Sequence, residues 1–230
     1  QLTGIAATLI NLPQVITSAI AISLVPVISS AYAVNDIKRT RENTNLAIRV
    51  SLLIGLPCAV GLFVLATPII GLLYPNEPAS VGGILAIMAI GVVFLSLIQS
   101  FTSVLQGMGK AHIPVFNLFV GAAVKFVLTY VLTAIPSLNV KGAAISTVVA
   151  YVVAAVLDYF SVKKYLGLKF SVNDFLFRPL ITAGIMGIIA RVTYVLTVPF
   201  VGNSISTLLA VAVGGVVYVV KLFLTKTITR

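Results

Sequence analysis

The chain has 230 residues, of which 60% are hydrophobic and only 9% are charged. Soluble domains usually carry about a quarter charged residues, so this composition excludes an ordinary soluble protein and predicts an integral membrane protein. The formal net charge is +10, and in such a chain we expect the basic residues to mark one side of the membrane rather than a nucleic-acid surface.

Seven apolar segments are each long enough to cross a hydrocarbon layer of about 30 Å, which takes about 20 helical residues. They cover residues 2–32, 46–74, 81–106, 114–135, 142–162, 176–197 and 204–224. Turn-forming residues separate them, and they lack the strict alternation of membrane β-strands. The sequence therefore predicts an all-α integral membrane protein with about seven transmembrane helices.

Basic residues fall at alternate breaks between these segments. Twelve Lys and Arg residues lie in or beside the first, third and fifth breaks and in the tail, whereas the other breaks hold only Lys141. Because cytoplasmic loops are enriched in Lys and Arg, we expect the N-terminus of this chain to lie outside and its C-terminus in the cytoplasm.

Polar side chains recur on one face of two predicted helices. In the first segment Asn11, Gln14 and Ser18 follow at spacings of three and four residues, close to Pro13, which should kink the helix. The third segment carries a longer stripe of Ser96, Gln99, Ser100, Ser103 and Gln106. Such stripes are typical of hydrogen bonding between membrane helices or of a hydrated pathway. Taken together with a lysine in the fourth segment, they favour the pathway.

That lysine, Lys125, lies eleven residues after Pro114 and ten before Ile135. A charged side chain at mid-depth costs about 2.5 to 3.5 kcal/mol on insertion scales and usually faces a bundle interior or a water-filled cavity. At about 100° per residue, small and polar residues accompany the charge. Its side of the helix carries Leu118, Gly121, Ala122, Thr129 and Leu132, with Asn117 and Thr133 at the margin. A desolvated ammonium favours an anionic ligand such as phosphate or pyrophosphate.

The chain offers little to support catalysis. His112 is the only histidine and Cys58 the only cysteine, so no metal cluster, disulfide or histidine triad can be built from this chain alone. Asp158 is the one acid within the predicted spans, and we expect it to pair with Lys163 or Arg178. The sequence thus predicts no enzyme, no cofactor and no metal site.

Four stretches together resemble a known family. They are LPQVITSAIAISLVPVIS (residues 12–29), GLPCAVGLFVLATPIIGLLY (55–74), LQGMGKAHIPVFN (105–117) and VKGAAISTVVAYVVAAVLDYFSVKKYLG (140–167). In the order and spacing of their Gly and Pro residues they are similar to the second half of the stage V sporulation protein B group. That group lies within the multidrug, oligosaccharidyl-lipid and polysaccharide flippase superfamily, which also contains the MurJ lipid II flippases.

The resemblance implies a MATE-like transporter of fourteen spans in two lobes around a central cavity. Residues 1–166 would be the C-terminal lobe and residues 167–230 two additional helices flanking a groove for a lipid tail, with an N-terminal lobe missing before Gln1. It implies a flippase that moves polyprenyl-pyrophosphate-linked sugars, such as peptidoglycan or polysaccharide precursors, across the bacterial cytoplasmic membrane by alternating access. The implied partners are membrane lipids, this lipid-linked substrate and the missing lobe.

On this interpretation Lys125 binds the pyrophosphate and polar residues hydrate the sugar path. The candidate cavity residues are Lys125, Asn11, Gln14, Gln99, Ser103, Asn117 and Thr129. Three cations at the cytoplasmic mouth, Arg39, Arg41 and Arg49, would gather anionic headgroups or simply follow the topology rule. Two alternatives stay open: an ion-coupled drug or metabolite exporter of the same superfamily, which should need a carboxylate at mid-depth, and a membrane assembly protein that transports nothing.

Overall fold

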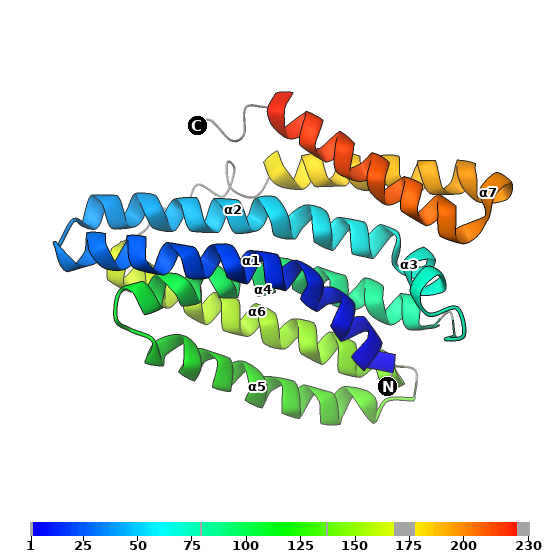
Figure 1. Ribbon diagram of the computed structural model, residues 1–230. Coiled ribbons are helices and arrows are strands. Elements are labelled where there is room, and N and C mark those ends of the chain that lie inside the picture. The colour runs from blue at the N-terminus through cyan, green and yellow to red at the C-terminus, as the bar shows by residue number, and fades with distance from the viewer. Residues whose placement is uncertain (1, 79, 137, 168–177, 225–230) are drawn as a thin grey trace.

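The computed structural model describes residues 2–78, 80–136, 138–167 and 178–224, and within these ranges its regular structure is entirely helical. Six helices are long and apolar enough to cross a membrane, which confirms the predicted all-α membrane fold (Figure 1). In chain order the helices are α1 (Leu2–Ala33), α2 (Ile37–Val64), α3 (Ala66–Leu73), α4 (Ser80–Gly107), α5 (His112–Thr133), α6 (Asn139–Leu166) and α7 (Arg178–Leu224).

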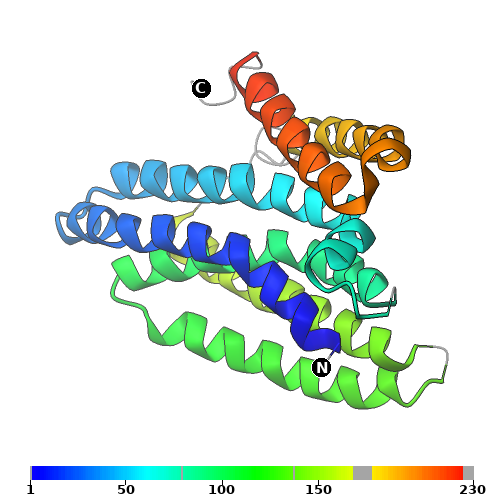
Figure 2. The same ribbon diagram turned by 45° about the vertical axis from the view of Figure 1, so that its right-hand side comes forward.

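The last helix, α7, contains both of the final predicted spans. Its backbone leaves the helical conformation at Gly202, where φ is 75° and ψ is 175°, a conformation that only glycine adopts readily. The two arms on either side of Gly202 fold back against each other as a hairpin at the edge of the molecule (Figures 1 and 2). With the two arms of α7 counted separately, the described residues hold one apolar helical segment for each of the seven predicted spans, although the predicted start at residue 176 lies outside them.

The second predicted span, residues 46–74, consists of two helices. α2 begins nine residues earlier, at Ile37, because the Asp36 side chain accepts a hydrogen bond of 2.9 Å from the Arg39 backbone N–H and so caps the helix. α2 ends at Val64 and α3 begins at Ala66. This break follows from Pro68, which has no N–H to donate to the Val64 carbonyl.

α1 bends in its N-terminal part, where the ribbon turns away from the line of the remaining helix (Figures 1 and 2). Pro13 lies in this part and is buried. The Thr17 hydroxyl donates to the Pro13 carbonyl at 3.2 Å and to the Gln14 carbonyl at 3.1 Å. The bend agrees with the kink predicted at Pro13.

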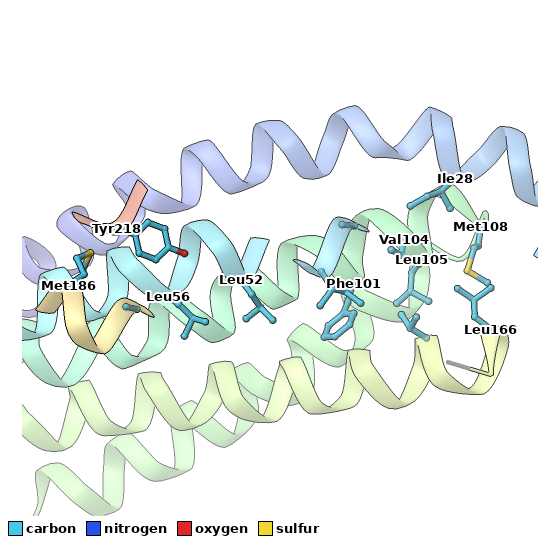
Figure 3. Packing of buried hydrophobic residues seen from close by; sticks show 14 residues of the cluster. Ile28, Leu52, Leu56, Phe101, Val104, Leu105, Met108, Leu166, Met186 and Tyr218 are labelled. Carbon is cyan, nitrogen blue, oxygen red and sulfur yellow. The ribbon is translucent and has the colours of Figure 1, made fainter. Parts of the chain in front are cut away.

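α4 is the centre of the bundle, since it packs on α1, α2, α3 and α6 and touches α5. Two apolar clusters lie along it. The larger joins side chains of α1, α2, α4, α6 and α7, including Ile28, Leu52, Phe101, Leu105 and Tyr218 (Figure 3). The other lies toward the beginning of α4 and includes Leu9, Ile10, Val81 and Leu85. This packed centre is a rigid frame on which α5 and α7 sit at the periphery.

The turns of the bundle fall at two ends. The α1–α2 and α4–α5 turns and the C-terminal end of α6 lie together at one end, and the α3–α4 and α5–α6 turns lie at the other (Figure 1). The first group carries the basic residues of the first and third breaks, and Lys163 and Lys164 from the fifth. Successive turns between the predicted spans therefore alternate between the two ends of the bundle, as the charge pattern predicts. The assignment of the basic end to the cytoplasm stays a prediction.

Candidate functional site

Lys125 lies on α5, a helix that packs mainly on α6. The two helices approach closely because small residues face the neighbouring backbone. A Cβ atom added at Gly121 would lie 3.0 Å from the Ala150 carbonyl oxygen, and one added at Gly142 would lie 2.7 Å from the Leu132 carbonyl oxygen. Small-residue packing of this kind is common between membrane helices. It accounts for part of the small-residue face that the sequence associates with Lys125.

The Lys125 side chain lies at the edge of this α5–α6 seam and is exposed. Lys125 is eight residues before the end of α5 at Thr133, about 12 Å along the axis at 1.5 Å per residue. Lys125 is therefore two residues closer to the end of its helix than in the predicted span 114–135, where ten residues separate it from Ile135. No hydrogen bond or ion pair joins its ammonium group to another residue of the described ranges. A ligand approaching from outside this bundle can reach the charge.

Two other candidate cavity residues, Asn117 and Thr129, are engaged within the seam. Asn117 is 6% exposed, and its Nδ2 donates to Asp158 Oδ1 at 2.8 Å and to Ser161 Oγ at 3.3 Å. The hydroxyls of Thr129 and Ser146 share a hydrogen bond of 2.6 Å. These bonds hold α5 on α6, which favours the packing interpretation for both residues.

The predicted pairing of Asp158 with Lys163 does not occur. Five residues apart on one helix, the two side chains point about 140° away from each other. Asp158 is 1% exposed beside Asn117, whereas the Lys163 ammonium lies 5.9 Å from the centroid of the Tyr159 ring. The side chain of Arg178, the other expected partner, lies outside the described residues.

The polar stripe of α4 is largely used in packing against α2. Ser96 faces Gly55 so closely that a Cβ at Gly55 would lie 2.5 Å from Ser96 Oγ. The Ser100 hydroxyl contacts the Ser51 hydroxyl and the Ala47 carbonyl, and Ser103, 3% exposed, donates to the Ser100 carbonyl at 2.9 Å. Only Gln99, half-buried, and Gln106, exposed, extend beyond the buried interface.

The polar residues of α1 are more accessible. Asn11 is exposed, and Gln14 and Ser18 are half-buried. Further along the helix Ser23, Ser29 and Ser30 are exposed as well. Within the described residues α1 does not contact α5, so the structure does not bring Asn11 or Gln14 together with Lys125 in one closed pocket.

The three predicted mouth cations lie on α2, Arg39 and Arg41 within its first two turns and Arg49 about three turns along. Arg39 is exposed, Arg49 is half-buried, and the Arg41 guanidinium donates from Nε to the Leu166 carbonyl at the end of α6. Arg41 therefore satisfies one of the carbonyls that a helix end leaves unpaired and complements the negative end of the α6 dipole. Arg41 has a structural role at the position where the sequence suggested headgroup capture.

An apolar groove of about 460 Å³ lies between α7 and the helices α1, α2 and α3. One wall comes from α7, and the facing wall includes Pro13, Pro57, Cys58 and Leu65. Its lining is entirely hydrophobic or glycine; on α7 it consists of Met186, Ala190, Ala210, Val211, Gly214 and Gly215. The arrangement suits a hydrocarbon chain that enters from the membrane. Residue patterns alone give no signal for this groove, because four helices contribute ordinary apolar side chains to it.

Two polar contacts beside the groove also escaped sequence reasoning. The Tyr218 hydroxyl donates to the Leu53 carbonyl at 2.7 Å, and Asn203 Nδ2 donates to the Pro68 carbonyl at 3.3 Å. Each joins residues more than 130 positions apart. The available signals were prolines within one predicted span and polar residues within another that is distant in the sequence. The sequence does not reveal which proline-containing helix contacts which polar residue.

The family model of the lipid II flippase MurJ matches residues 4–224 of the chain. The chain belongs to the MurJ family. Stage V sporulation protein B of Bacillus subtilis is 31% identical over 76% of this chain and 33% of its own length. The lipid II flippase MurJ of Bacillus subtilis is 24% identical over 91% of this chain and 40% of its own length. The family resemblance inferred from the sequence is thereby confirmed.

The fold is shared with a solved MurJ structure. A lipid II flippase MurJ in an inward closed conformation superposes with a TM-score of 0.69 at 22% sequence identity, covering 98% of this chain and 48% of that chain. The chain thus spans between a third and about half of the MurJ relatives it matches.

Proposed function

We propose that the chain is part of a flippase that carries a polyprenyl-pyrophosphate-linked sugar of the lipid II type across the cytoplasmic membrane. The observation that carries this proposal is the apolar groove of about 460 Å³ in a chain that belongs to the MurJ family. A long prenyl tail cannot leave the hydrocarbon layer without a large loss of free energy, about 0.8 kcal/mol for each CH₂ group. A flippase for such a lipid therefore needs an apolar site beside a polar path.

The headgroup end of the substrate has different requirements. Its pyrophosphate needs a cation inside the membrane, and Lys125 is an exposed cation on α5 without a partner among the described residues. The sugar needs hydrogen-bonding groups, and the open side of α1 offers Asn11, Gln14 and Ser18. We assign the tail to the groove, the pyrophosphate to Lys125 and the sugar path to α1.

An N-terminal lobe outside this chain would complete the cavity, with residues 1–166 as the C-terminal lobe of a MATE-like arrangement and residues 167–230 as its two additional helices. The coverage of the relatives supports a further part of the protein outside this chain, since the matched region makes up only 33% to 48% of the length of the relatives compared above. Alternating access would come from rocking of the two lobes. Flippases of this kind move lipids without chemical change, in keeping with the prediction that the chain is not an enzyme.

The groove can be blocked at one position without disturbing the fold. A Cβ added at Gly215 meets no atom within 4 Å, so the large side chain of Gly215→Trp should extend into the groove. The matched control is Val216→Trp, because Val216 is 63% exposed and does not line the groove. Flipping is measured in a full-length protein that contains this chain, as the appearance of lipid-linked precursor on the outer membrane face.

We expect Gly215→Trp to lower flipping at least about tenfold, a loss of about 1.4 kcal/mol in the productive complex, at normal abundance. Val216→Trp should keep the parent rate. Parent-like flipping by both variants would contradict the assignment of the tail to the groove.

A further inference from the structure

The α7 hairpin packs on one side of the bundle. Among the described residues it contacts only α2 and α3, and Figures 1 and 2 show it apart from α4, α5 and α6. Hydrogen bonds cross from α7 to the facing wall at two places that border the groove, from Tyr218 to the Leu53 carbonyl and from Asn203 to the Pro68 carbonyl.

The Leu53 carbonyl is a special acceptor. In a helix it would receive the N–H of the residue four positions later, but that residue is Pro57, which has no N–H. An unpaired carbonyl is unfavourable in the hydrocarbon layer. Tyr218, 8% exposed, supplies the missing donor at 2.7 Å, and Figure 3 shows its hydroxyl directed toward α2. The position of α7 is therefore tied to a backbone group that a proline has released.

Asn203 makes the second attachment, directly after the Gly202 turn. Its Oδ1 accepts a hydrogen bond of 2.8 Å from the Tyr194 hydroxyl on the first arm, and its Nδ2 donates to the Pro68 carbonyl on α3. The contact needs a glycine on α3, because a Cβ at Gly71 would lie 3.0 Å from Asn203 Nδ2. One side chain thus joins both arms of the hairpin to α3.

The groove lies between these two attachments. Along the second arm of α7, the lining residues from Ala210 to Gly215 follow Asn203 and precede Tyr218. The opposite wall, with Pro57 and Leu65, belongs to the α2–α3 unit that receives both hydrogen bonds. We propose that Tyr218 and Asn203 are positioning residues that fix the separation of α7 from α2 and α3 and thereby set the width of the groove. That the groove holds a prenyl tail rests on the proposed function.

The separation can be measured directly with two spin labels in a full-length protein that contains this chain. Cys58, the only cysteine of this chain, and any cysteines in the rest of the full-length protein are first changed to Ala. The labels are then attached through Phe63→Cys on α2 and Val216→Cys on α7. Phe63 is 51% and Val216 63% exposed, so the labels stay out of the groove. Tyr218→Phe and Asn203→Ala should each broaden the distance distribution between the labels without loss of helix content.

Tyr130→Phe is the matched control, since Tyr130 lies on α5, is 79% exposed and makes no hydrogen bond to another of the described residues through its hydroxyl. Its distribution should equal that of the parent. Pro57→Ala restores an N–H for the Leu53 carbonyl, so Tyr218→Phe should broaden the distribution less in that background than in the parent. Unchanged distributions for both Tyr218→Phe and Asn203→Ala would overturn the proposal.

Binding separates this inference from the proposed function. With undecaprenyl phosphate as the probe, we expect Tyr218→Phe to bind about fivefold more weakly than the parent, as for the loss of one net hydrogen bond. If the parent binds no undecaprenyl phosphate while the label distances still respond to Tyr218→Phe, the proposed function fails and the positioning role stands. If the parent binds and the distances do not respond, the positioning role fails alone.

Discussion

A lysine in the hydrocarbon layer is tolerated when water, an anion or an acid reaches its ammonium group. Lys125 finds no acid among the described residues, and the large side chains next to it, Leu118 and Phe126, are 55% and 79% exposed. Snorkelling to the nearer end of α5 would have to bridge about 12 Å, since Lys125 lies eight residues before Thr133. The charge is therefore best explained by a ligand or by water outside the bundle described here.

Removing this charge should lower activity and leave the protein intact. We expect Lys125→Ala and Lys125→Gln to reduce flipping in the full-length protein by about thirtyfold or more, the loss of a charge-assisted bond of about 2 kcal/mol or more. Lys125→Arg should retain part of the activity because it keeps the charge with a different geometry. Abundance should be normal or higher, because a neutral residue inserts more easily by about 2.5 to 3.5 kcal/mol.

Lys141→Gln is the control for this series, because Lys141 is an exposed lysine in the first turn of α6. It should flip at the parent rate. Parent-like flipping by Lys125→Gln would remove the pyrophosphate assignment. A Lys125→Ala protein that is lost from the membrane, rather than present and inactive, would favour the assembly-protein alternative.

At the scale of helices, the α5–α6 seam depends on glycine. A Cβ at Gly142 would meet the Leu132 backbone at 2.7 Å, and a backbone atom cannot move aside as the end of a flexible side chain can. We expect Gly142→Ala to destabilise the protein by about 1 to 3 kcal/mol, the usual range for overpacking, and to lower its thermal unfolding temperature in detergent. Gly184→Ala on α7 is the control, since nothing lies within 4 Å of its added Cβ. An equal melting temperature for the two variants would refute the close approach of α5 and α6.

The helices were predictable from the sequence, but their partners were not. Spans of uninterrupted apolar residues, such as 81–106 and α4 (Ser80–Gly107), agree within a residue or two, because length and hydropathy are local properties. Ser103 and Asn117 show the limit: a polar stripe has the same spacing whether it faces water or another helix. The neighbouring helix decides, and it came from a distant part of the chain, as with Asp158 for Asn117.

Helix breaks were predictable only where several signals coincided. Gly202 and Asn203 together marked the turn of α7, whereas the break before Pro68 was missed because apolar residues surround it. The groove was expected only through the family resemblance. Its walls come from four helices, and glycines such as Gly214 and Gly215 have no signature of their own.

For the whole molecule, the two outer faces differ in character. The exposed side chains of α5 include Phe119, Phe126 and Tyr130, as expected for contact with lipid. α1 also exposes apolar side chains such as Val15 and Ile22, but Asn11 lies exposed among them, and its amide would be unfavourable against lipid tails. This contrast supports the proposal that another lobe, or water between the lobes, covers α1 in the complete transporter.

The two ends of the bundle also differ, and their sides can be tested. The charge pattern places the α4–α5 turn in the cytoplasm and the α3–α4 turn outside. In a Cys58→Ala background without other cysteines, we expect Asn76→Cys, on the exposed α3–α4 turn, to react with a membrane-impermeant maleimide in intact cells. His112→Cys, exposed at the start of α5, should react only after permeabilisation. The reverse labelling pattern would invert the topology and place the basic end of the bundle, with Arg39 and Lys110, on the outer face. The cytoplasmic mouth predicted at Arg39, Arg41 and Arg49 would then lie on the wrong side of the membrane, even if the groove and Lys125 keep their roles.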